Sequence, residues 1–207
     1  EAEQAMEKAA KALEAEPENI DARALRGAGY LREGRLDEAR ADAQFTLGKE
    51  PTNVPATSVL VGVLQKEGKT KEAIELLKKT TAGNPKETAL RLLLIELYRR
   101  DKNIDGIETT YHELFAAEPK NLSYRTDLAR FLVAFGEKDK AEHLLRETVT
   151  ALPGDEKAKL VLIDFLANQR SFEQAEGALK AFIKEAPDEA ELKFGLTQLY
   201  VKHQQAD

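Results

Sequence analysis

The stretch IDARALRGAGYLREGRLDEARADAQFTLGKEPTN, residues 20–53, contains two amphipathic helical patterns separated by a glycine and closed by a proline. Gly34 lies between the two patterns, and glycine readily adopts the left-handed conformation that ends a helix. Asp37 stands near the start of the second pattern, where an acid suits the helix dipole. The second helix is expected to stop before Pro51, because the residue preceding a proline is pushed out of the helical region. The stretch therefore predicts one helix–turn–helix unit.

The same unit repeats along the whole chain every 34 residues, which is the spacing between Pro17 and Pro51. The prolines that mark it are Pro17, Pro51, Pro85, Pro119, Pro153 and Pro187. With these prolines set at repeat position 32, position 20 holds Ala5, Ala39, Ala73, Ile107, Ala141 and Ala175. Small side chains at that position let the two helices of a unit approach closely. So regular a series is not credible as chance, and it predicts a single repeat array over residues 1–207.

The proline register divides the chain into full and partial repeats. Full repeats cover residues 20–53, 54–87, 88–121, 122–155 and 156–189, while residues 1–17 hold a second helix and residues 190–207 a first helix. Good N-cap residues stand two positions after four of the prolines, namely Asn19, Asn53, Asn121 and Asp155. Because both ends fall inside a repeat, we expect a fragment of a longer protein whose open ends pack against a neighbour.

The pattern resembles the tetratricopeptide repeat, with a small residue at position 8, an aromatic at 11, Ala at 20 and Pro at 32. Repeat 20–53 matches it best, with Gly27, Tyr30, Gly34, Ala39 and Pro51. It departs from the family at position 4, where the usual Trp is absent, and at position 7, where Arg26 replaces the usual Leu. The resemblance implies an all-α fold, a right-handed superhelical α-solenoid of antiparallel helix pairs with about twelve helices.

Composition narrows the classes of function. The chain is 42% hydrophobic and 33% charged, and no apolar run approaches the ~20 residues of a transmembrane helix, so we expect no direct membrane insertion. A net charge of −6 disfavours nucleic acid as a partner. The absence of cysteine excludes disulfides and thiolate chemistry. It leaves the compartment open, because such a chain suits the cytoplasm and the bacterial periplasm equally.

Patterns for catalysis or metal binding are missing from the sequence. His112, His143 and His203 fall in three different repeats, without the spacing of metal ligands. No GxSxG, Walker-type or GxGxxG loop is present. Acid pairs such as Asp37–Glu38 stand at helix starts, where capping and the helix dipole explain them. We therefore expect no enzyme activity and no cofactor.

In the resembled family, partners usually lie in a groove lined by positions 2, 5, 9, 12 and 13 of the first helices. Carried over to this chain, the candidate peptide-binding residues are Ala24, Ala28, Arg32, Ser58, Gly62, Lys66, Leu92, Glu96, Arg99, Arg130 and Asp164. The same positions of the repeats from residue 122 to 189 add Thr126, Val133, Lys157, Leu160 and Asn168, among others. Basic residues outnumber acids there, which implies a groove for an extended, partly acidic peptide, with Arg99 and Arg130 as anchors. Alternatively, these basic residues only complement the dipoles of nearby helix ends.

Small side chains line the N-terminal half of this groove, among them Ala24, Ala28, Ser58 and Gly62. We expect them to admit a ligand backbone close to the helices. The family's clamp for chaperone tails uses Lys at position 5 and Asn at position 9, which these four residues replace. A cochaperone function is therefore disfavoured.

Three functions stay open. The first is a non-catalytic protein–protein interaction scaffold that binds a peptide or protein segment, and unbroken arrays of this kind resemble bacterial scaffold proteins and lipoproteins of envelope or secretion assembly. The second is a regulatory or targeting domain of a larger enzyme. The third is self-association through the open solenoid ends.

Overall fold

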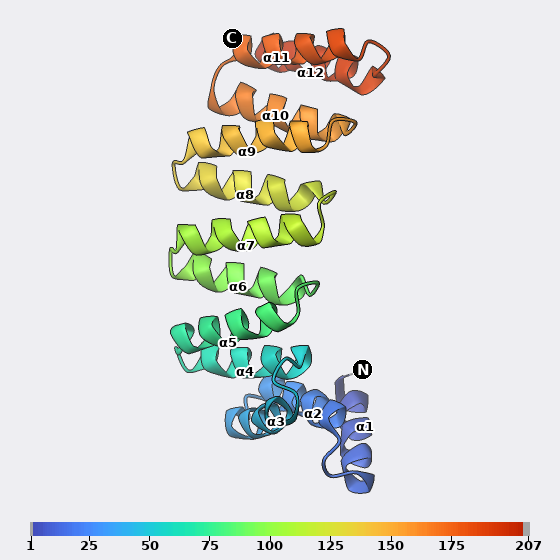
Figure 1. Cartoon of the computed structure of the whole chain (residues 1–207), viewed down its shortest axis with the longest axis vertical. Coiled ribbons are helices and arrows are strands. Elements are labelled where there is room, and N and C mark those ends of the chain that lie inside the picture. Colours follow the sequence, from blue (N-terminus) through green and yellow to red (C-terminus); the bar gives the residue numbers. More distant parts are fainter. Residues whose placement is uncertain (1, 205–207) are drawn as a thin grey trace. The chain divides into compact units, whose positions relative to one another are not determined.

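The computed structural model describes residues 2–204 of the 207-residue chain. In this range the chain forms twelve α-helices and no strand (Figure 1). The expected all-α solenoid of helix pairs is thereby confirmed. Glu1 and residues 205–207, the outermost positions of the two partial repeats, lie outside the described range.

The helices alternate between the first and the second helix of each repeat. The first helices are α2 (Ile20–Glu33), α4 (Val54–Lys66), α6 (Ala89–Arg100), α8 (Leu122–Ala134), α10 (Glu156–Gln169) and α12 (Ala190–Gln204). The second helices are α1 (Ala2–Ala15), α3 (Leu36–Lys49), α5 (Thr70–Gly83), α7 (Ile104–Ala117), α9 (Lys138–Ala151) and α11 (Phe172–Glu185). Every second helix ends two residues before a repeat proline, because the residue before proline cannot stay helical.

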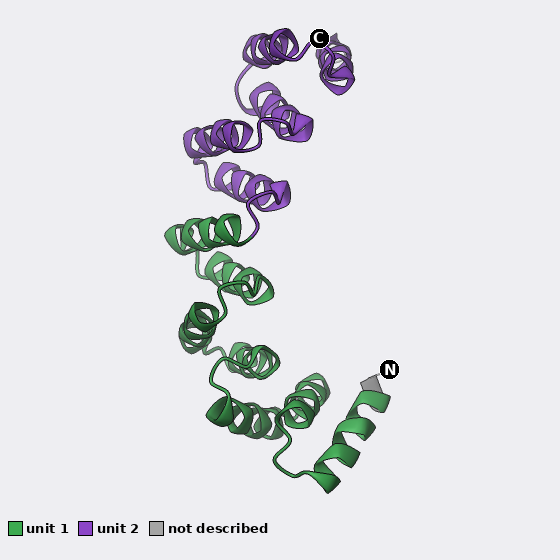
Figure 2. Cartoon of the chain, turned by 45° about the vertical axis from the view of Figure 1, so that its right-hand side comes forward, with its two compact units in different colours: residues 1–117 green, residues 118–207 purple. Residues whose placement is uncertain are grey.

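Contacts divide the chain into two compact units, Glu1–Ala117 and Glu118–Asp207 (Figure 2). Unit 1 holds α1 to α7, and unit 2 holds α8 to α12. Within each unit every helix packs against the next one along the chain. First helices of successive repeats also touch, α2 with α4 in unit 1 and α10 with α12 in unit 2. A single uninterrupted array over residues 1–207 stays a prediction.

Side-chain caps start the first helices where the sequence predicts them. The caps are Asn19, Asn53, Asn121 and Asp155, each accepting a hydrogen bond from a backbone N–H of the helix that follows. Repeat 88–121 has Glu87 in the equivalent place, and its carboxylate accepts a hydrogen bond of 3.0 Å from the N–H of Ala89. These bonds satisfy backbone donors that have no partner inside the helix.

The turn between the two helices uses left-handed backbone in most repeats. Gly34, Gly68 and Gly136 at position 15 have φ of 79°, 74° and 83°. Lys102 takes the same position with φ 55°, and within residues 2–204 no other non-glycine residue has positive φ. Since a side chain in this conformation costs about 1 kcal/mol, the turn geometry is imposed on Lys102 by the repeat.

A buried carboxylate explains the departure at position 7. Arg26 donates two hydrogen bonds to the carboxylate of Asp42, from Nε to Oδ2 at 2.7 Å and from Nη2 to Oδ1 at 2.9 Å. Arg23 adds a third bond of 3.2 Å to Oδ1. The hydrogen bond to Asp42 raises the pKa of Arg26 above its usual value. An ion pair therefore joins α2 to α3 in this repeat, whereas the other full repeats carry Leu at position 7.

Position 4, where the family's Trp is absent, is mostly basic: Arg23, Arg91, Arg125, Lys159 and Lys193. Arg91 is buried and donates to the carbonyl of Asn84 at 3.2 Å and to Glu113 at 2.9 Å. Lys159 is also buried and donates to Glu189 at 2.8 Å. These bonds hold a first helix to neighbouring turns and helices, in the place of an aromatic ring.

Candidate functional site

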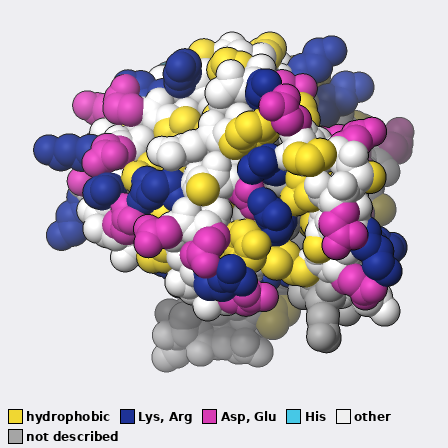
Figure 3. Space-filling view, turned by 90° about the horizontal axis from the view of Figure 1, so that it is seen from below, with side chains coloured by type: hydrophobic (Ala, Val, Ile, Leu, Met, Phe, Trp, Pro, Cys, Tyr) yellow, Lys and Arg dark blue, Asp and Glu magenta, His cyan; other side chains and the backbone are white. Residues whose placement is uncertain are grey.

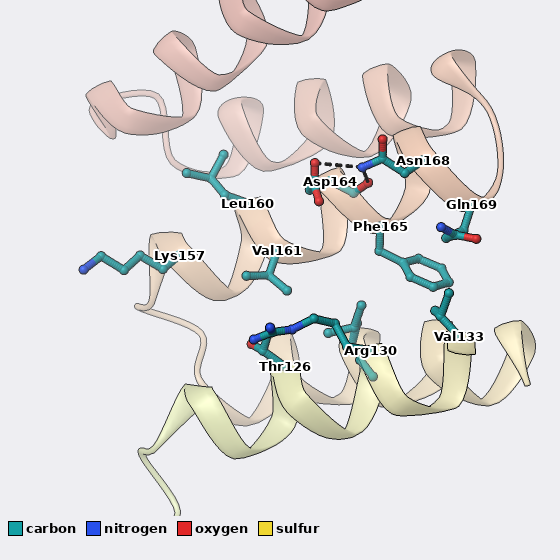
Figure 4. Close-up of a pocket in the computed structure, with 12 residues that line it drawn as sticks. Thr126, Arg130, Val133, Lys157, Leu160, Val161, Asp164, Phe165, Asn168 and Gln169 are labelled. Atoms are coloured by element: carbon teal, nitrogen blue, oxygen red, sulfur yellow. Dashed lines mark hydrogen bonds between the residues drawn. The ribbon is translucent and has the colours of Figure 1, made fainter. Parts of the chain in front are cut away.

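A cavity of about 590 Å³ lies between the first helices α8 and α10 of unit 2 (Figure 4). Predicted groove positions contribute Thr126, Arg130, Val133, Lys157, Leu160, Asp164 and Asn168 to its lining. Neighbouring positions that the sequence did not indicate contribute Ala129, Leu145, Val161, Phe165 and Gln169. The structure thus brings two of the candidate site residues, Arg130 and Asp164, into one cavity. We call it the α8–α10 cavity.

Apolar side chains line the middle of the α8–α10 cavity. Val161 points between the two helices, and Phe165 and Val133 face one another across the gap (Figure 4). Leu160 lies next to them on α10. Ligand pockets typically combine such an apolar lining with a few polar groups. This arrangement can bury an apolar side chain of a partner.

One side of the cavity is basic. The Nη2 atom of Arg130 lies 2.8 Å from the carboxylate of Asp127, and its guanidinium group lies beside Thr126 (Figure 4). Lys157 is exposed and has no ion-pair or hydrogen-bond partner within the described residues. Arg130 is therefore locally neutralised, and Lys157 carries the uncompensated positive charge on this side.

The other side of the cavity is held by a polar network. The side-chain amide of Asn168 donates to Asp164 at 2.9 Å, as Figure 4 shows. Lys202 of α12 donates to Asn168 at 2.9 Å and lies 3.7 Å from the carboxylate of Asp164. Asp164 is thus neutralised by Lys202, and the net charge around the cavity comes from Lys157.

The groove positions stay accessible beyond this cavity within unit 2. A smaller cavity of about 270 Å³ between α10 and α12 shares Leu160 and Asp164 with the first. On α12, Phe194 and Val201 at positions 5 and 12 are 64% and 48% exposed. Unit 2 therefore offers an accessible, partly apolar surface along three successive first helices.

Groove positions of unit 1 are partly taken up by helix packing. Ala24 is only 3% exposed. At Gly62 an added Cβ would lie 2.5 Å from Cδ2 of Leu31, so the leucine covers this glycine. Ala24 is thus buried and Gly62 is covered by Leu31, and the expectation that small side chains admit a ligand backbone here stays a prediction. Ala28 is partly exposed, and Ser58 is exposed.

The charged candidates of unit 1 are exposed, apart from the partly exposed Glu96, and two of them are paired with each other. Arg32 and Lys66 lie at the ends of α2 and α4. Glu96 on α6 binds Arg99 at 3.6 Å. Leu92, on the same helix, is 43% exposed. Arg99 belongs to unit 1 and Arg130 to unit 2, so their joint action as anchors stays a prediction.

Charges of both signs mix on the face of the molecule drawn in Figure 3, with hydrophobic side chains between them. Exposed ion pairs also occur elsewhere on the described surface, such as Arg35 with Glu38 at 2.9 Å. Within residues 2–204, no group of three or more His, Asp or Glu side chains is placed to hold a metal ion. In the same range no helix has the length and hydropathy needed to cross a membrane.

Comparison with known proteins matches residues 30–97 to the tetratricopeptide repeat model. No curated protein sequence matches the chain. Among solved structures, MamA from residue 41 to its end, from Desulfovibrio magneticus RS-1, has 17% identity and a TM-score of 0.56, over 75% of this chain and 88% of that chain.

Two larger assemblies share the fold as well. Naa15/Naa10 bound to HypK-THB has 19% identity and a TM-score of 0.60, over 97% of this chain and 32% of that chain. The hetero-tetramer Cut9–Hcn1 of the APC/C has 14% identity and a TM-score of 0.57, over 98% of this chain and 40% of that chain. The matching family model over residues 30–97, the 34-residue register and these structures together show that the chain has the fold of tetratricopeptide repeat proteins.

Proposed function

We propose that the chain is a non-catalytic scaffold that binds an extended segment of a partner protein in the α8–α10 cavity. The proposal rests on one observation: residues at predicted groove positions of two adjacent repeats line the same, largely apolar cavity. Family members are typically non-catalytic scaffolds. Two structures with the same fold, Naa15/Naa10 with HypK-THB and Cut9 with Hcn1, are complexes with other proteins, which supports a protein partner.

The lining favours a partner segment with an apolar residue close to an acid. The apolar side chain would pack between Val161 and Val133, where burial of apolar surface contributes most of the binding free energy. A neighbouring carboxylate would meet Lys157 and compete with Asp127 for Arg130. The acidic character of the partner thus follows from the one uncompensated charge of the cavity.

Selection from a random library of 12-residue displayed peptides tests this function. We expect the selected peptides to combine an apolar residue with an acid. Substituting Arg130→Gln and Lys157→Gln together should weaken their binding about tenfold, since two charge-assisted contacts are lost.

The matched control is Arg32→Gln with Lys66→Gln, which removes the same charge from groove positions of unit 1. It should change the affinity less than about twofold. Equal effects of the two double variants, or a failure to select any peptide, would reject the α8–α10 cavity as the binding site.

Self-association is the second candidate, because Phe194 on α12 is 64% exposed. A contact of this side chain with another copy would remove it from water. Sedimentation velocity across a concentration series tests self-association by comparing the unmodified chain with the Phe194→Ser variant. A monomer at every concentration would exclude self-association. The groove along the first helices of unit 2 would then bind a different protein, whether the chain acts as a scaffold or as a targeting domain of a larger enzyme.

A further inference from the structure

A smaller cavity adjoins the α8–α10 cavity on the other side of α10. It has a volume of about 270 Å³, lies between α10 and α12, and shares Leu160 and Asp164 with the α8–α10 cavity. The apolar side chains of its lining include Leu160, Ile163, Ala167 and Leu199. We call it the α10–α12 cavity. Because an apolar cavity of about 150 Å³ is large enough to bind benzene, the α10–α12 cavity has room for one apolar side chain.

A glycine in α12 gives the two cavities a common wall. Position 6 of the repeat is Gly195 in α12. The full repeats carry larger side chains at this position, namely Leu25, Val59, Leu93, Asp127 and Val161. A Cβ on Gly195 would lie 2.7 Å from Cδ2 of Leu160, so Leu160 lies against the backbone of α12. Asp164 follows one turn later on α10, and these two residues form a ridge with one cavity on each side.

The two cavities differ in charge. Asp164 and Lys202, the charged residues that line the α10–α12 cavity, lie 3.7 Å apart and neutralise each other. Lys157 lines the α8–α10 cavity and not the α10–α12 cavity. The α10–α12 cavity therefore favours an uncharged apolar side chain, whereas the α8–α10 cavity favours an apolar side chain with an acid beside it.

The separation of the cavities sets the spacing of two residues that enter both. One helix, α10, lies between them, and packed helices lie about 8–10 Å apart. In a β-strand, residues on the same side are about 7 Å apart when two positions separate them and about 13 Å apart at four positions. In the polyproline II conformation, residues three positions apart lie on the same side at a distance of about 9 Å. The polyproline II spacing thus matches the separation of the cavities best.

We propose that one partner segment occupies both cavities, with two apolar residues three positions apart in the polyproline II conformation. This rests on the proposed function, since the segment must bind in the α8–α10 cavity. Leu160 contacts both apolar residues from the ridge between the cavities. An acid next to one of them meets Lys157, and this acid decides which apolar residue enters the α8–α10 cavity.

Four synthetic peptides in a proline–serine host sequence test the spacing by fluorescence anisotropy. Three of them carry two leucines, at spacings of two, three and four positions, with a glutamate on the outer side of each leucine. The fourth has the spacing-three sequence with one leucine replaced by serine. We expect the spacing of three to bind about tenfold more tightly than the single leucine, because a second apolar side chain is buried. Tighter binding at a spacing of two or four, or no gain over the single leucine, would overturn the proposal.

A variant that fills the α10–α12 cavity tests where the second leucine binds. Ala167→Leu enlarges a side chain of this cavity and leaves the lining of the α8–α10 cavity unchanged. It should weaken the spacing-three peptide about tenfold and the single-leucine peptide less than about twofold. Gln65→Leu, at the same repeat position 12 in unit 1, is the matched control and should change neither affinity.

The same peptides distinguish the two-cavity proposal from the proposed function. Suppose that the single-leucine peptide binds and is weakened by Arg130→Gln with Lys157→Gln. Equal effects of Ala167→Leu on both peptides, or no effect on the spacing-three peptide, would then overturn the two-cavity proposal alone. A single-leucine peptide that is insensitive to the double variant, or no binding by any of the peptides up to about 1 mM, would overturn both.

Discussion

Repeats 20–53 and 122–155 share one register, yet the surface that each forms with the next repeat differs. In unit 1, Leu31 at position 12 covers Gly62 at position 9 of the next repeat. In unit 2 the equivalent pair is Val133 and Asp164, and a cavity of about 590 Å³ lies there. Leu31 covers Gly62 and closes this surface in unit 1, whereas the shorter Val133 faces Phe165 in unit 2 and leaves a cavity. Register locates the groove, and side-chain size decides which part of it a partner can reach.

The largest effect that we expect is a loss of stability in unit 1, where the surface between first helices is closed. Asp42→Ala leaves Arg26 and Arg23 without their buried partner and should destabilise unit 1 by about 3 kcal/mol. Hydrogen exchange of the α2 and α3 amides would measure the loss. The exposed Asp37→Ala is the control, with an expected change below about 0.5 kcal/mol. Similar protection in both variants would show that the ion pair contributes little to holding these helices together.

An exchange of side chains tests the comparison itself. Val133→Leu with Asp164→Gly carries the closed arrangement into unit 2, and it should lower the affinity for selected peptides at least about tenfold because the cavity is filled. The reciprocal variant, Leu31→Val with Gly62→Asp, should leave that affinity unchanged. Circular dichroism controls for folding, since glycine within α10 costs about 1 kcal/mol. Retained affinity in the first variant would mean that peptides bind elsewhere.

The smallest effect concerns the turns at position 15. Lys102→Gly should stabilise unit 1 by about 0.5–1 kcal/mol, because glycine adopts the observed φ of 55° without a steric penalty. Gly34→Ala, at φ 79°, should destabilise it by about 1 kcal/mol. Thermal unfolding of the two variants gives the comparison. A lower melting temperature for Lys102→Gly would show that the lysine side chain stabilises the turn more than its conformation costs.

Features that depend on the local backbone were predictable from the sequence. The cap formed by Asn19, the left-handed turn at Gly34 and the end of α3 before Pro51 each follow from one residue and its immediate neighbours. The groove positions followed from the repeat register, which placed Arg130 and Asp164 on helices that line one cavity.

Contacts between side chains from different helices were not predictable in this way. The closure of unit 1 depends on Leu31 reaching Gly62 in another repeat. The partner of Arg26 lies on the next helix, and the only signal was Asp42 at a position where Leu76 and Leu144 stand in other repeats. Basic residues at position 4, where the family has Trp, were visible in the sequence. The groups to which they donate hydrogen bonds were not, because those groups come close only in the folded chain.

The most direct test of the peptide-binding account is photo-crosslinking of one selected peptide to p-benzoylphenylalanine placed in two variants. One variant carries it in place of Leu160, and the other in place of Ser58, which occupies the same repeat position 5 in unit 1. We predict that the peptide crosslinks at position 160 and that unlabelled peptide competes for the reaction, with little product at position 58. Equal crosslinking at both positions, or crosslinking at position 58 alone, would contradict the assignment of the binding site to the α8–α10 cavity.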